Sequence, residues 1–327
     1  MTSHTILSKF RDLSALVVGD ICLDRWCRYD PTLSEPSRET GIPRIAVVSS
    51  VLTPGAGGTV ASNLMALGAG RVDVLGVRGA DGHGTELKRA LEDRSIGARR
   101  LLSSDLAPTF TYTKLLNLRT GDEDQPRIDF VNPEPMPAAL ETAVLAALSE
   151  AIPQFDVILV ADQAETRQGG VVTAAVREAI STAASANPGK IFWVDSRERP
   201  ELFRGVIVKP NESEARRACL RLFGEEDLPR LRASIEAPFL FVTRGPGGVD
   251  AFTQNAMMHI PTVPVEHPVD ICGAGDSFSA AAALALAVTG SAVEAARFGN
   301  AAASITIMKK GTATASAEEV IAALALP

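Results

Sequence analysis

The sequence has 327 residues, of which 46% are hydrophobic and 22% charged, with a formal net charge of −7 and an isoelectric point near 5.3. This length can fill one large α/β core or two modest domains. The acidic balance argues against nucleic acid or an anionic membrane as the main partner. The basic pairs Arg99-Arg100 and Arg216-Arg217 fit solvated surface better than anion sites.

The four cysteines show no CxxC pairing and no companion histidines at zinc-ligand spacing. They indicate reduced thiols, and we expect a cytoplasmic protein. No apolar run reaches the length of about 18 residues that a membrane span requires, so no membrane partner is expected. The four histidines are too scattered to predict a catalytic triad or a metal cluster.

Short apolar runs alternate with helical stretches along the chain, as in a sheet of buried parallel strands joined by helices. Helices are predicted over 84–93 and 171–186, and the Ala-rich run 280–288 reads as a buried helix. The alternation predicts an α/β fold with a doubly wound, mostly parallel sheet and helices on both faces. The predicted strands are 16–19, 72–77, 157–160, 191–194, 206–208 and 239–242.

Three extended segments, 44–51, 109–118 and 127–131, have no crossover helices between them. They predict a small β lid over the mouth of the central sheet, formed by segments of about 25–52 and 108–131. No linker divides the chain, so residues 1–327 are expected to form a single domain.

The strongest motif is Asp270-Ile271-Cys272-Gly273-Ala274-Gly275-Asp276-Ser277-Phe278, directly before the Ala-rich helix. Its glycines let backbone N–H groups turn inward at a helix N-terminus, where free donors and partial positive charge bind phosphate oxygens. Asp276 falls in the first helical turn. It is either a partner of the helix dipole or a base aimed at a hydroxyl beside a bound phosphoryl group.

A second glycine cluster runs from Pro54 to Asn63 and leads into a helix. Small residues there allow a ligand to touch the backbone, although a tight loop without a ligand has the same composition. The sixth position of a forced GxGxxG match is Val60, which disfavours a dinucleotide site and hence an oxidoreductase.

Five motifs follow one another along the chain, namely Gly19 to Asp24, Pro54 to Asn63, Lys209 to Glu214, Val242 to Gly248 and Asp270 to Phe278. Their order resembles that of ribokinase-like (PfkB) carbohydrate kinases, and the resemblance runs from about residue 14 to the C-terminus. Their sequences most resemble the heptose 7-phosphate kinase domain of bacterial bifunctional heptose enzymes. The resemblance implies transfer of the γ-phosphoryl group of ATP to a hydroxyl of a sugar or sugar phosphate, with magnesium. It also implies that lids can pair in a homodimer.

On the acceptor side, the resemblance implies that Asp24, at the end of the first strand, holds acceptor hydroxyls; a surface or salt-bridged acid is the alternative. Gly57 and Gly58 would let the substrate lie against the backbone. Asn63 belongs to the same loop, although it fits a bond to its own helix better. Thr59 stands where the family commonly has Asn.

On the nucleotide side, Asn211 and Glu214 resemble the family's Asn-x-x-Glu, which organises magnesium and phosphate through water. Their alternatives are a helix cap and a solvated acid. Thr243 and Gly245 resemble residues that line the phosphates and ribose. Asn300 and Ala303 lie on a helix that resembles the wall of the adenine pocket, or serves ordinary core packing.

The implied mechanism places Asp276 as the base, with the amides of Gly273, Ala274 and Gly275 stabilising charge on the phosphoryl group. Asp270 and the carbonyl of Ile271 resemble part of a potassium site.

The acceptor side departs from the heptose-phosphate pattern at Asp162-Gln163-Ala164-Glu165 and Asp195-Ser196-Arg197. The first change removes a lysine and adds a carboxylate, whereas Arg197 can hold a phosphate. A nucleotide- or metabolite-binding protein that lost efficient catalysis is therefore the alternative to an active kinase.

Overall fold

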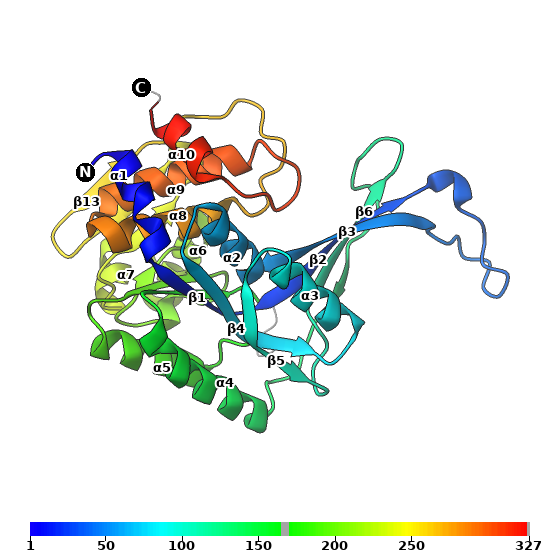
Figure 1. The fold of residues 1–327 in the computed structure, drawn as a ribbon, viewed down its shortest axis with the longest axis horizontal. Helices are drawn as coiled ribbons and strands as arrows, with labels where there is room; N and C mark the ends of the chain where they lie inside the picture. Colours follow the sequence, from blue (N-terminus) through cyan, green and yellow to red (C-terminus); the bar gives the residue numbers. More distant parts are fainter. Residues whose placement is uncertain (165–169, 326–327) are drawn as a thin grey trace.

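A computed structural model describes residues 1–164 and 170–325, and it contains a large sheet and a small one (Figure 1). The large sheet has the strand order β13-β12-β11-β10-β9-β8-β1-β4-β5. Its strands are β1 (Ser14–Gly19), β4 (Arg71–Gly79), β5 (Gly97–Ser104), β8 (Val157–Asp162), β9 (Ile191–Ser196), β10 (Ile207–Val208), β11 (Leu240–Thr243), β12 (Val249–Phe252) and β13 (Met257–Ile260).

Helices cover both faces of this sheet, because its strands are apolar on both sides. In β1, Val17 packs with the helices of one face, whereas Leu16 and Val18 pack with those of the other. The first face carries α1 (Ser3–Ser8), α2 (Gly57–Ala66), α3 (Gly82–Glu92), α8 (Ala274–Thr289), α9 (Ala292–Thr306) and α10 (Ala317–Leu324). The second carries α4 (Ala138–Ala151), α5 (Ala174–Ala186), α6 (Glu212–Phe223) and α7 (Leu228–Ser234).

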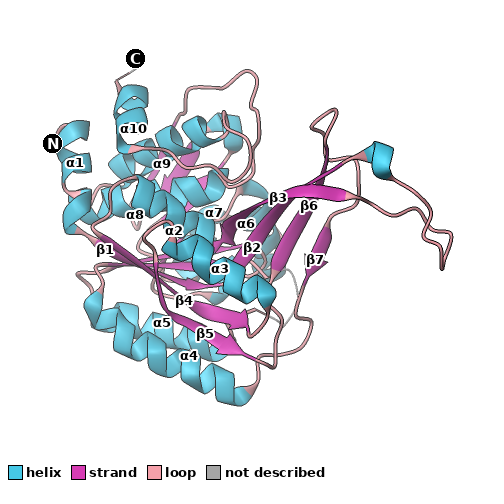
Figure 2. Ribbon diagram, turned by 45° about the vertical axis from the view of Figure 1, so that its right-hand side comes forward, coloured by secondary structure: helices cyan, strands magenta, loops and turns pink. Residues whose placement is uncertain are grey.

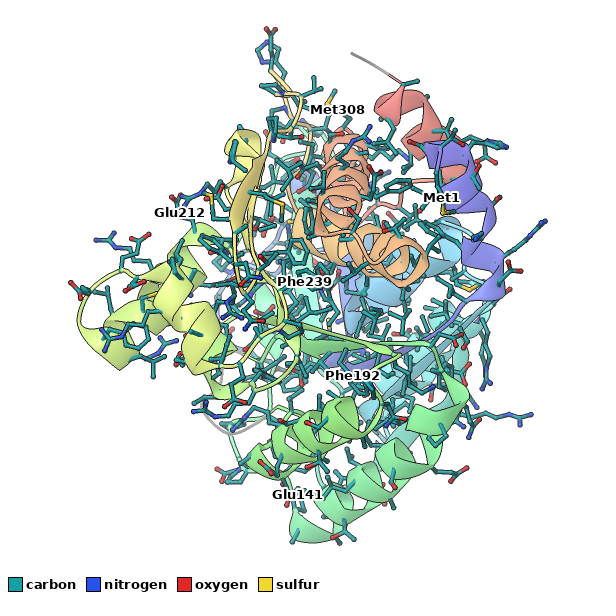
Figure 3. The ribbon with its side chains drawn as sticks, turned by 90° about the vertical axis from the view of Figure 1, so that its left-hand side faces the viewer. Met1, Glu141, Phe192, Glu212, Phe239 and Met308 are labelled. Atoms are coloured by element: carbon teal, nitrogen blue, oxygen red, sulfur yellow. The ribbon has the colours of Figure 1, made fainter. Side chains whose placement is uncertain are left out.

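Figure 3 shows how the side chains fill the space between these layers, with Phe192 of β9 on the side of α4 and α5. In the large sheet, neighbouring strands are parallel from β5 at one edge through β4, β1, β8, β9 and β10 to β11. Strands β12 and β13 are antiparallel additions at the other edge. The predicted doubly wound fold is thus confirmed. No helix in the described part of the chain is long and apolar enough to cross a membrane.

The chain order reverses beside β1, whose neighbours are β4 and β8. A crevice forms outside the carboxyl ends of parallel strands at such a switch point, and ligands bind there. The ends of β1 and β8 bring Asp20 and Gln163 together at this place, where the Gln163 N–H donates to the Asp20 carboxylate at 2.8 Å.

The small sheet is the predicted lid, with the order β3-β2-β6-β7. Figure 2 shows it standing beyond the carboxyl edge of the large sheet, with the 30–46 segment as an arm at its far end. Its strands are β2 (Ile21–Tyr29), β3 (Val47–Ala56), β6 (Thr111–Asn117) and β7 (Ile128–Phe130).

The structure corrects the predicted boundaries of the lid. Only Asp20 separates β1 from β2, so the lid begins at residue 21, and it continues to residue 56 rather than 52. Asp24 therefore lies inside a lid strand and not at the end of the first strand. Helix α5 begins at Ala174 rather than 171, because the Thr173 side chain accepts the Val176 N–H and caps the helix there.

Candidate active site

A pocket of about 160 Å³ lies between the lid and the N-terminal end of α8. The lid contributes aromatic and charged side chains, and the end of the main sheet contributes Gln163 and Arg197. The other lining residues are Asp24, Trp26, Ala56, Thr59, Tyr112, Lys114, Arg127, Cys272, Gly273, Asp276 and Thr312. The pocket thus combines two carboxylates with three cationic side chains.

The glycine-rich segment forms the N-terminus of α8. Gly273 caps this helix in the left-handed conformation, with φ of 79°, which favours glycine. The N–H groups of the first helical turn have no partner inside a helix and are available to an anion. The Ala274 N–H is an exception, because it donates to the Ile271 carbonyl at 3.3 Å.

Asp276 lies in the first turn of α8 and reaches the floor of the pocket. The pKa of its carboxyl is raised to about 8, chiefly by burial and next by the negative charge of Asp195. The positive charges of Lys209 and Arg197 oppose this rise. A carboxyl with this pKa exchanges a proton near neutral pH, as a general base must.

Lys209 and Asp195 form a buried ion pair beside the glycine loop, with 2.9 Å between Nζ and Oδ2. Ser279 of α8 donates a further bond to Asp195 at 3.3 Å. A side chain on Gly275 would place its Cβ 3.4 Å from the Lys209 ammonium. The ion pair therefore lies directly against the loop that would hold a phosphoryl group.

Asp24 is 8% exposed and points from β2 into the pocket. Burial raises its pKa to about 6, while a bond from Thr312 and the charges of Lys114 and Arg127 favour the ionised form. Gly55 in the neighbouring strand makes room for it, since a Cβ there would lie 2.1 Å from the Asp24 Oδ1. Asp24 is thus a constrained hydrogen-bonding group rather than a surface acid.

Asn211 and Glu214 form a capping box at the start of α6. The Asn211 side chain accepts the Glu214 N–H at 2.9 Å, and the Glu214 carboxylate accepts the Asn211 N–H at 2.8 Å. Burial, followed by the charge of Asp195, raises the pKa of Glu214, and Lys209 opposes this rise. Asn211 is therefore a helix cap, and Glu214 is a buried acid rather than a solvated one.

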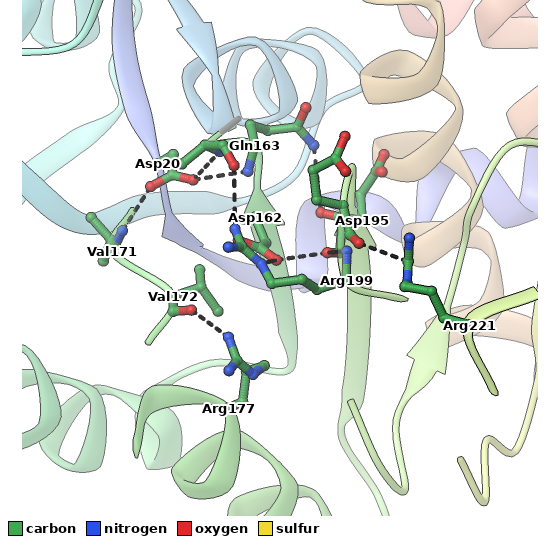
Figure 4. Close-up of polar contacts among 12 residues, drawn as sticks. Asp20, Asp162, Gln163, Val171, Val172, Arg177, Asp195, Arg199 and Arg221 are labelled. Atoms are coloured by element: carbon green, nitrogen blue, oxygen red, sulfur yellow. Dashed lines mark hydrogen bonds and ion pairs between the residues drawn. The ribbon is translucent and has the colours of Figure 1, made fainter. Parts of the chain in front are cut away.

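A second acidic network lies behind the pocket (Figure 4). The Asp20 carboxylate accepts three backbone N–H groups, from Gln163, Ala164 and Val171, each at 2.8 Å. Asp162 is fully buried and is held by two bonds from Arg199, at 2.7 and 3.2 Å. Both acids fix the end of β8. Glu165, predicted beside them, lies outside the described residues.

The family model for the pfkB family of carbohydrate kinases matches residues 16–319. This chain belongs to that family.

Curated relatives of this pfkB-family chain include the bifunctional protein HldE of Geotalea uraniireducens, 32% identical over 327 residues. The match covers 98% of this chain and 64% of that relative. The HldE protein of Geobacter metallireducens is 30% identical over 330 residues, with 98% and 65% covered. The chain thus spans less than two thirds of the length of these relatives.

Solved structures of similar fold include Arabidopsis thaliana ribokinase complexed with ribose and ATP, with a TM-score of 0.68 and 21% identity. The match covers 96% of this chain and 99% of the ribokinase. Phosphofructokinase-2 from Escherichia coli in complex with potassium gives a TM-score of 0.71 at 20% identity, with 96% and 98% covered. These likenesses show that the pfkB-family chain has the ribokinase fold.

Five of the residues predicted for the site in this pfkB-family chain meet in the pocket, namely Asp24, Thr59, Arg197, Gly273 and Asp276. Thr59 is nearly inaccessible, and its hydroxyl donates to the Pro54 carbonyl at 3.3 Å.

Three acceptor-side residues of the glycine loop lie against other parts of the protein. Asn63 is fully buried, and its amide is bonded to the Thr59 carbonyl and to the Ala315 N–H. A Cβ on Gly57 would meet the Ile21 side chain at 2.6 Å, and one on Gly58 would meet Pro54 at 2.5 Å. Protein atoms thus occupy the space that a side chain would need at both glycines.

The predicted nucleotide-side residues lie outside this pocket. Thr243 ends β11 beside the start of α6, and its N–H donates to the Pro210 carbonyl at 3.1 Å. Gly245 has a positive φ of 53° and open space around its Cα. Asn300 donates from its side chain to the carbonyls of Ile260 and Pro261, so it fixes the segment after β13. Ala303 lies one turn further along α9, partly buried.

Among the described residues, no cluster of three His, Cys, Asp or Glu side chains is arranged to hold a metal. Magnesium needs few protein ligands because it retains several waters. The carboxylate of Glu214, oriented by the capping box, fits that water-mediated role together with Asn211.

Sequence reasoning missed the charged groups that surround the predicted residues, above all Lys114, Arg127, Lys209 and Asp195. The signal for Lys209 was its place directly before Pro210-Asn211, and that for Asp195 was its place at a strand end. Lys114 and Arg127 carry no local signal, because the pairing of β6 with β2 and β7 brings them over the pocket.

Proposed function

We propose that this chain transfers the γ-phosphoryl group of ATP to a hydroxyl of a sugar or sugar phosphate, with Asp276 as the general base. The observation that carries this proposal is the position of Asp276. Its carboxyl lies at the N-terminus of α8, beside unpaired first-turn N–H groups, in the same pocket as Asp24. This arrangement supports the proposal because it would let one base serve an acceptor hydroxyl beside a phosphoryl group.

In the proposed reaction, Asp24 accepts hydrogen bonds from the hydroxyls of the acceptor and fixes the reacting oxygen near Asp276. Asp276 then accepts the proton of that hydroxyl as the oxygen attacks phosphorus. The N–H groups of Gly273, Gly275 and Asp276 stabilise the charge of the phosphoryl group in transfer. Closure of the lid excludes water, which would otherwise compete as the acceptor.

Magnesium, when bound, neutralises charge on the ATP oxygens. Glu214 and Asn211 would hold its water shell, and Thr243, Gly245, Asn300 and Ala303 would line the nucleotide. The Lys209 ammonium lies beside Gly275 and favours negative charge there.

The basic side chains Arg127 and Arg197 both line the pocket, Arg127 from the lid segment before β7 and Arg197 from the end of β9. Guanidinium groups bind phosphate bidentately, so this pair favours an acceptor that already carries a phosphate. The family description, a carbohydrate kinase, and the ribose bound to the similar ribokinase support an acceptor of the sugar class. We also propose a cytoplasmic location, consistent with four free cysteines, and a homodimer formed through the lid.

The test measures ADP release with magnesium-ATP across pairs of neutral sugars and their phosphates, including heptose 7-phosphate, for the wild type and Asp276→Asn. Loss of a general base lowers turnover by about 10²–10⁴-fold. ATP affinity should persist in the variant, because Asp276 contacts the acceptor. Asp105→Asn, an exposed acid outside the pocket, is the matched control and should keep its turnover.

Near wild-type turnover in Asp276→Asn would remove the base from this assignment. ATP binding without turnover on any acceptor would favour the alternative, a nucleotide- or metabolite-binding protein on the same fold.

A further inference from the structure

The oxygens predicted to hold potassium already accept hydrogen bonds from the chain itself. The Asp270 carboxylate accepts the Cys272 N–H at 2.9 Å through Oδ1 and the Gly311 N–H at 3.1 Å through Oδ2. The Ile271 carbonyl accepts the Ala274 N–H at 3.3 Å. A monovalent cation at this position would have to compete with these three donors.

A cationic side chain reaches the same loop from the lid. Lys114 of β6 places its ammonium 3.4 Å from the Cys272 Sγ and 3.4 Å from the Glu123 carboxylate. The ammonium also lies 4.8 Å from the centre of the Trp26 ring, in cation–π range. The side chain is 20% exposed, and three neighbours hold it in place, namely Trp26, Cys272 and Glu123.

The charges of Lys114 and Asp270 each stabilise the ionised form of the other group. Burial would raise the pKa of Asp270, but the N–H donors and the Lys114 charge hold it below its usual value. Burial likewise opposes ionisation of Lys114, yet Cys272, Glu123 and Asp270 together raise its pKa. A second cation beside Asp270 would meet repulsion from this ammonium.

We propose that Lys114 is a positioning residue whose ammonium takes the place of a monovalent cation at the 270–273 loop, so that this enzyme works without potassium. The loop leads directly into the N–H groups at the start of α8, so a fixed charge there orients the anion site. Because Lys114 belongs to the lid, this charge also ties the position of the lid to that of the loop. The inference rests on the proposed function for its catalytic consequence.

The kinetic test compares turnover in potassium, sodium and N-methylglucamine chloride at one ionic strength. The wild type should be indifferent to the cation. Lys114→Met should lose turnover by about 10–100-fold, as expected when a catalytic loop is displaced. Potassium or ammonium should restore part of that loss, whereas N-methylglucamine should not. Strong potassium stimulation of the wild type, or no rescue of the variant, would overturn the proposal.

Lys310→Met is the matched control. Lys310 is exposed and lines a neighbouring groove beside the same loop, so removing its charge should change neither turnover nor the response to cations. A potassium requirement appearing in this control as well would show a general charge effect and would also count against Lys114.

A second readout does not depend on the acceptor. Potassium should raise the melting temperature of Lys114→Met by a few degrees over N-methylglucamine, because a ligand that binds only the folded state stabilises it. The wild type should show no such difference. This result separates the inference from the proposed function, since an inactive protein can still be melted. The role of Lys114 would be contradicted if potassium raised the melting temperature of the wild type, or if it left that of Lys114→Met unchanged.

Discussion

The pKa of Asp276 depends on neighbouring charges of both signs, which are those of Asp195, Lys209 and Arg197. Burial and the charge of Asp195 raise its pKa to about 8, against the opposing charges of Lys209 and Arg197. A base acts in its ionised form, so turnover with the acceptor should rise with pH through the pKa of Asp276. The two buried neighbours can be changed one at a time.

Asp195→Asn removes a negative charge, so the pKa of Asp276 falls and the pH-rate profile moves to lower pH. Lys209→Met removes a positive charge, so the pKa rises and the profile moves to higher pH. The measurement is kcat/KM for the acceptor between pH 6 and pH 10, the range around the shifted value. Asp105→Asn should leave the profile in place. Shifts in the same direction, or none, would show that the titrating base is another group.

At this scale, the sequence predicted the residues that a local pattern marks. The glycine loop before an apolar helix predicted Gly273 and Asp276. The spacing of three residues on one helix face predicted Asn211 and Glu214. The partners of these residues were not predictable, since 66 residues or more separate Asp276 from Lys209 and Asp195, and Lys114 approaches from the lid. The preference for a bond between Asn63 and its own helix agrees with the structure, where the amide donates to the Thr59 carbonyl and accepts the Ala315 N–H.

Among the elements, α6 combines two tasks in its first turn. Asn211 and Glu214 stabilise the helix by capping each other, and Glu214 is also the proposed holder of hydrated magnesium. Two substitutions can distinguish the capping task from the proposed magnesium task. Asn211→Ala removes the cap and should lower the free energy of unfolding by about 1 kcal/mol.

Glu214→Gln keeps an oxygen that accepts the Asn211 N–H but loses the negative charge. Its free energy of unfolding should stay near the wild-type value, while half-maximal turnover should require more magnesium. Urea denaturation measures the first quantity, and a magnesium titration of ADP release measures the second. An unchanged magnesium requirement in Glu214→Gln would leave the acid with a capping role alone.

The existence of most long elements was predictable, but their ends were set by caps and packing. Thr173 starts α5, and Asp81 starts α3 by accepting the Gly84 N–H. The prediction missed β2, since it follows β1 after one residue and shows a mixed rather than alternating pattern of burial. It also missed β12 and β13, which are only four residues each.

For the whole molecule, the lid leaves an apolar edge exposed. Strand β3 forms one edge of the small sheet, and all residues from Val47 to Val51 are exposed. Ile128 and Phe130 of β7 are about half exposed at the other edge. An exposed apolar edge strand invites pairing with another strand, and a second copy of the lid is the proposed partner.

Light scattering after size-exclusion chromatography should therefore give about twice the chain mass of 34.4 kDa. Val48→Asp places a charge on the exposed edge and should yield monomers. Leu220→Asp, equally exposed but on α6, should remain dimeric. A wild type that is monomeric at micromolar concentration would contradict the pairing of lids.

The overall architecture was accessible from the sequence because alternation of buried strands and helices fixes a doubly wound sheet. The extended segments that interrupt this alternation predicted the position of the lid in the sequence. The arm at residues 30–46 was not predictable, since its turns depend on the pairing of β2 with β3, which no local pattern reports.

Only Asp20 lies between β1 of the large sheet and β2 of the lid. The Asp20 carboxylate is clamped by three N–H groups, and its backbone is bonded to Ala161 and Gly57. β2 has nine residues, about 30 Å of extended chain, so a rotation of about 10° at Asp20 sweeps its far end through roughly 5 Å. A rotation of the lid about Asp20 would therefore move the arm far more than the main sheet. A spectroscopic label on the arm would be the most sensitive probe of such a rotation.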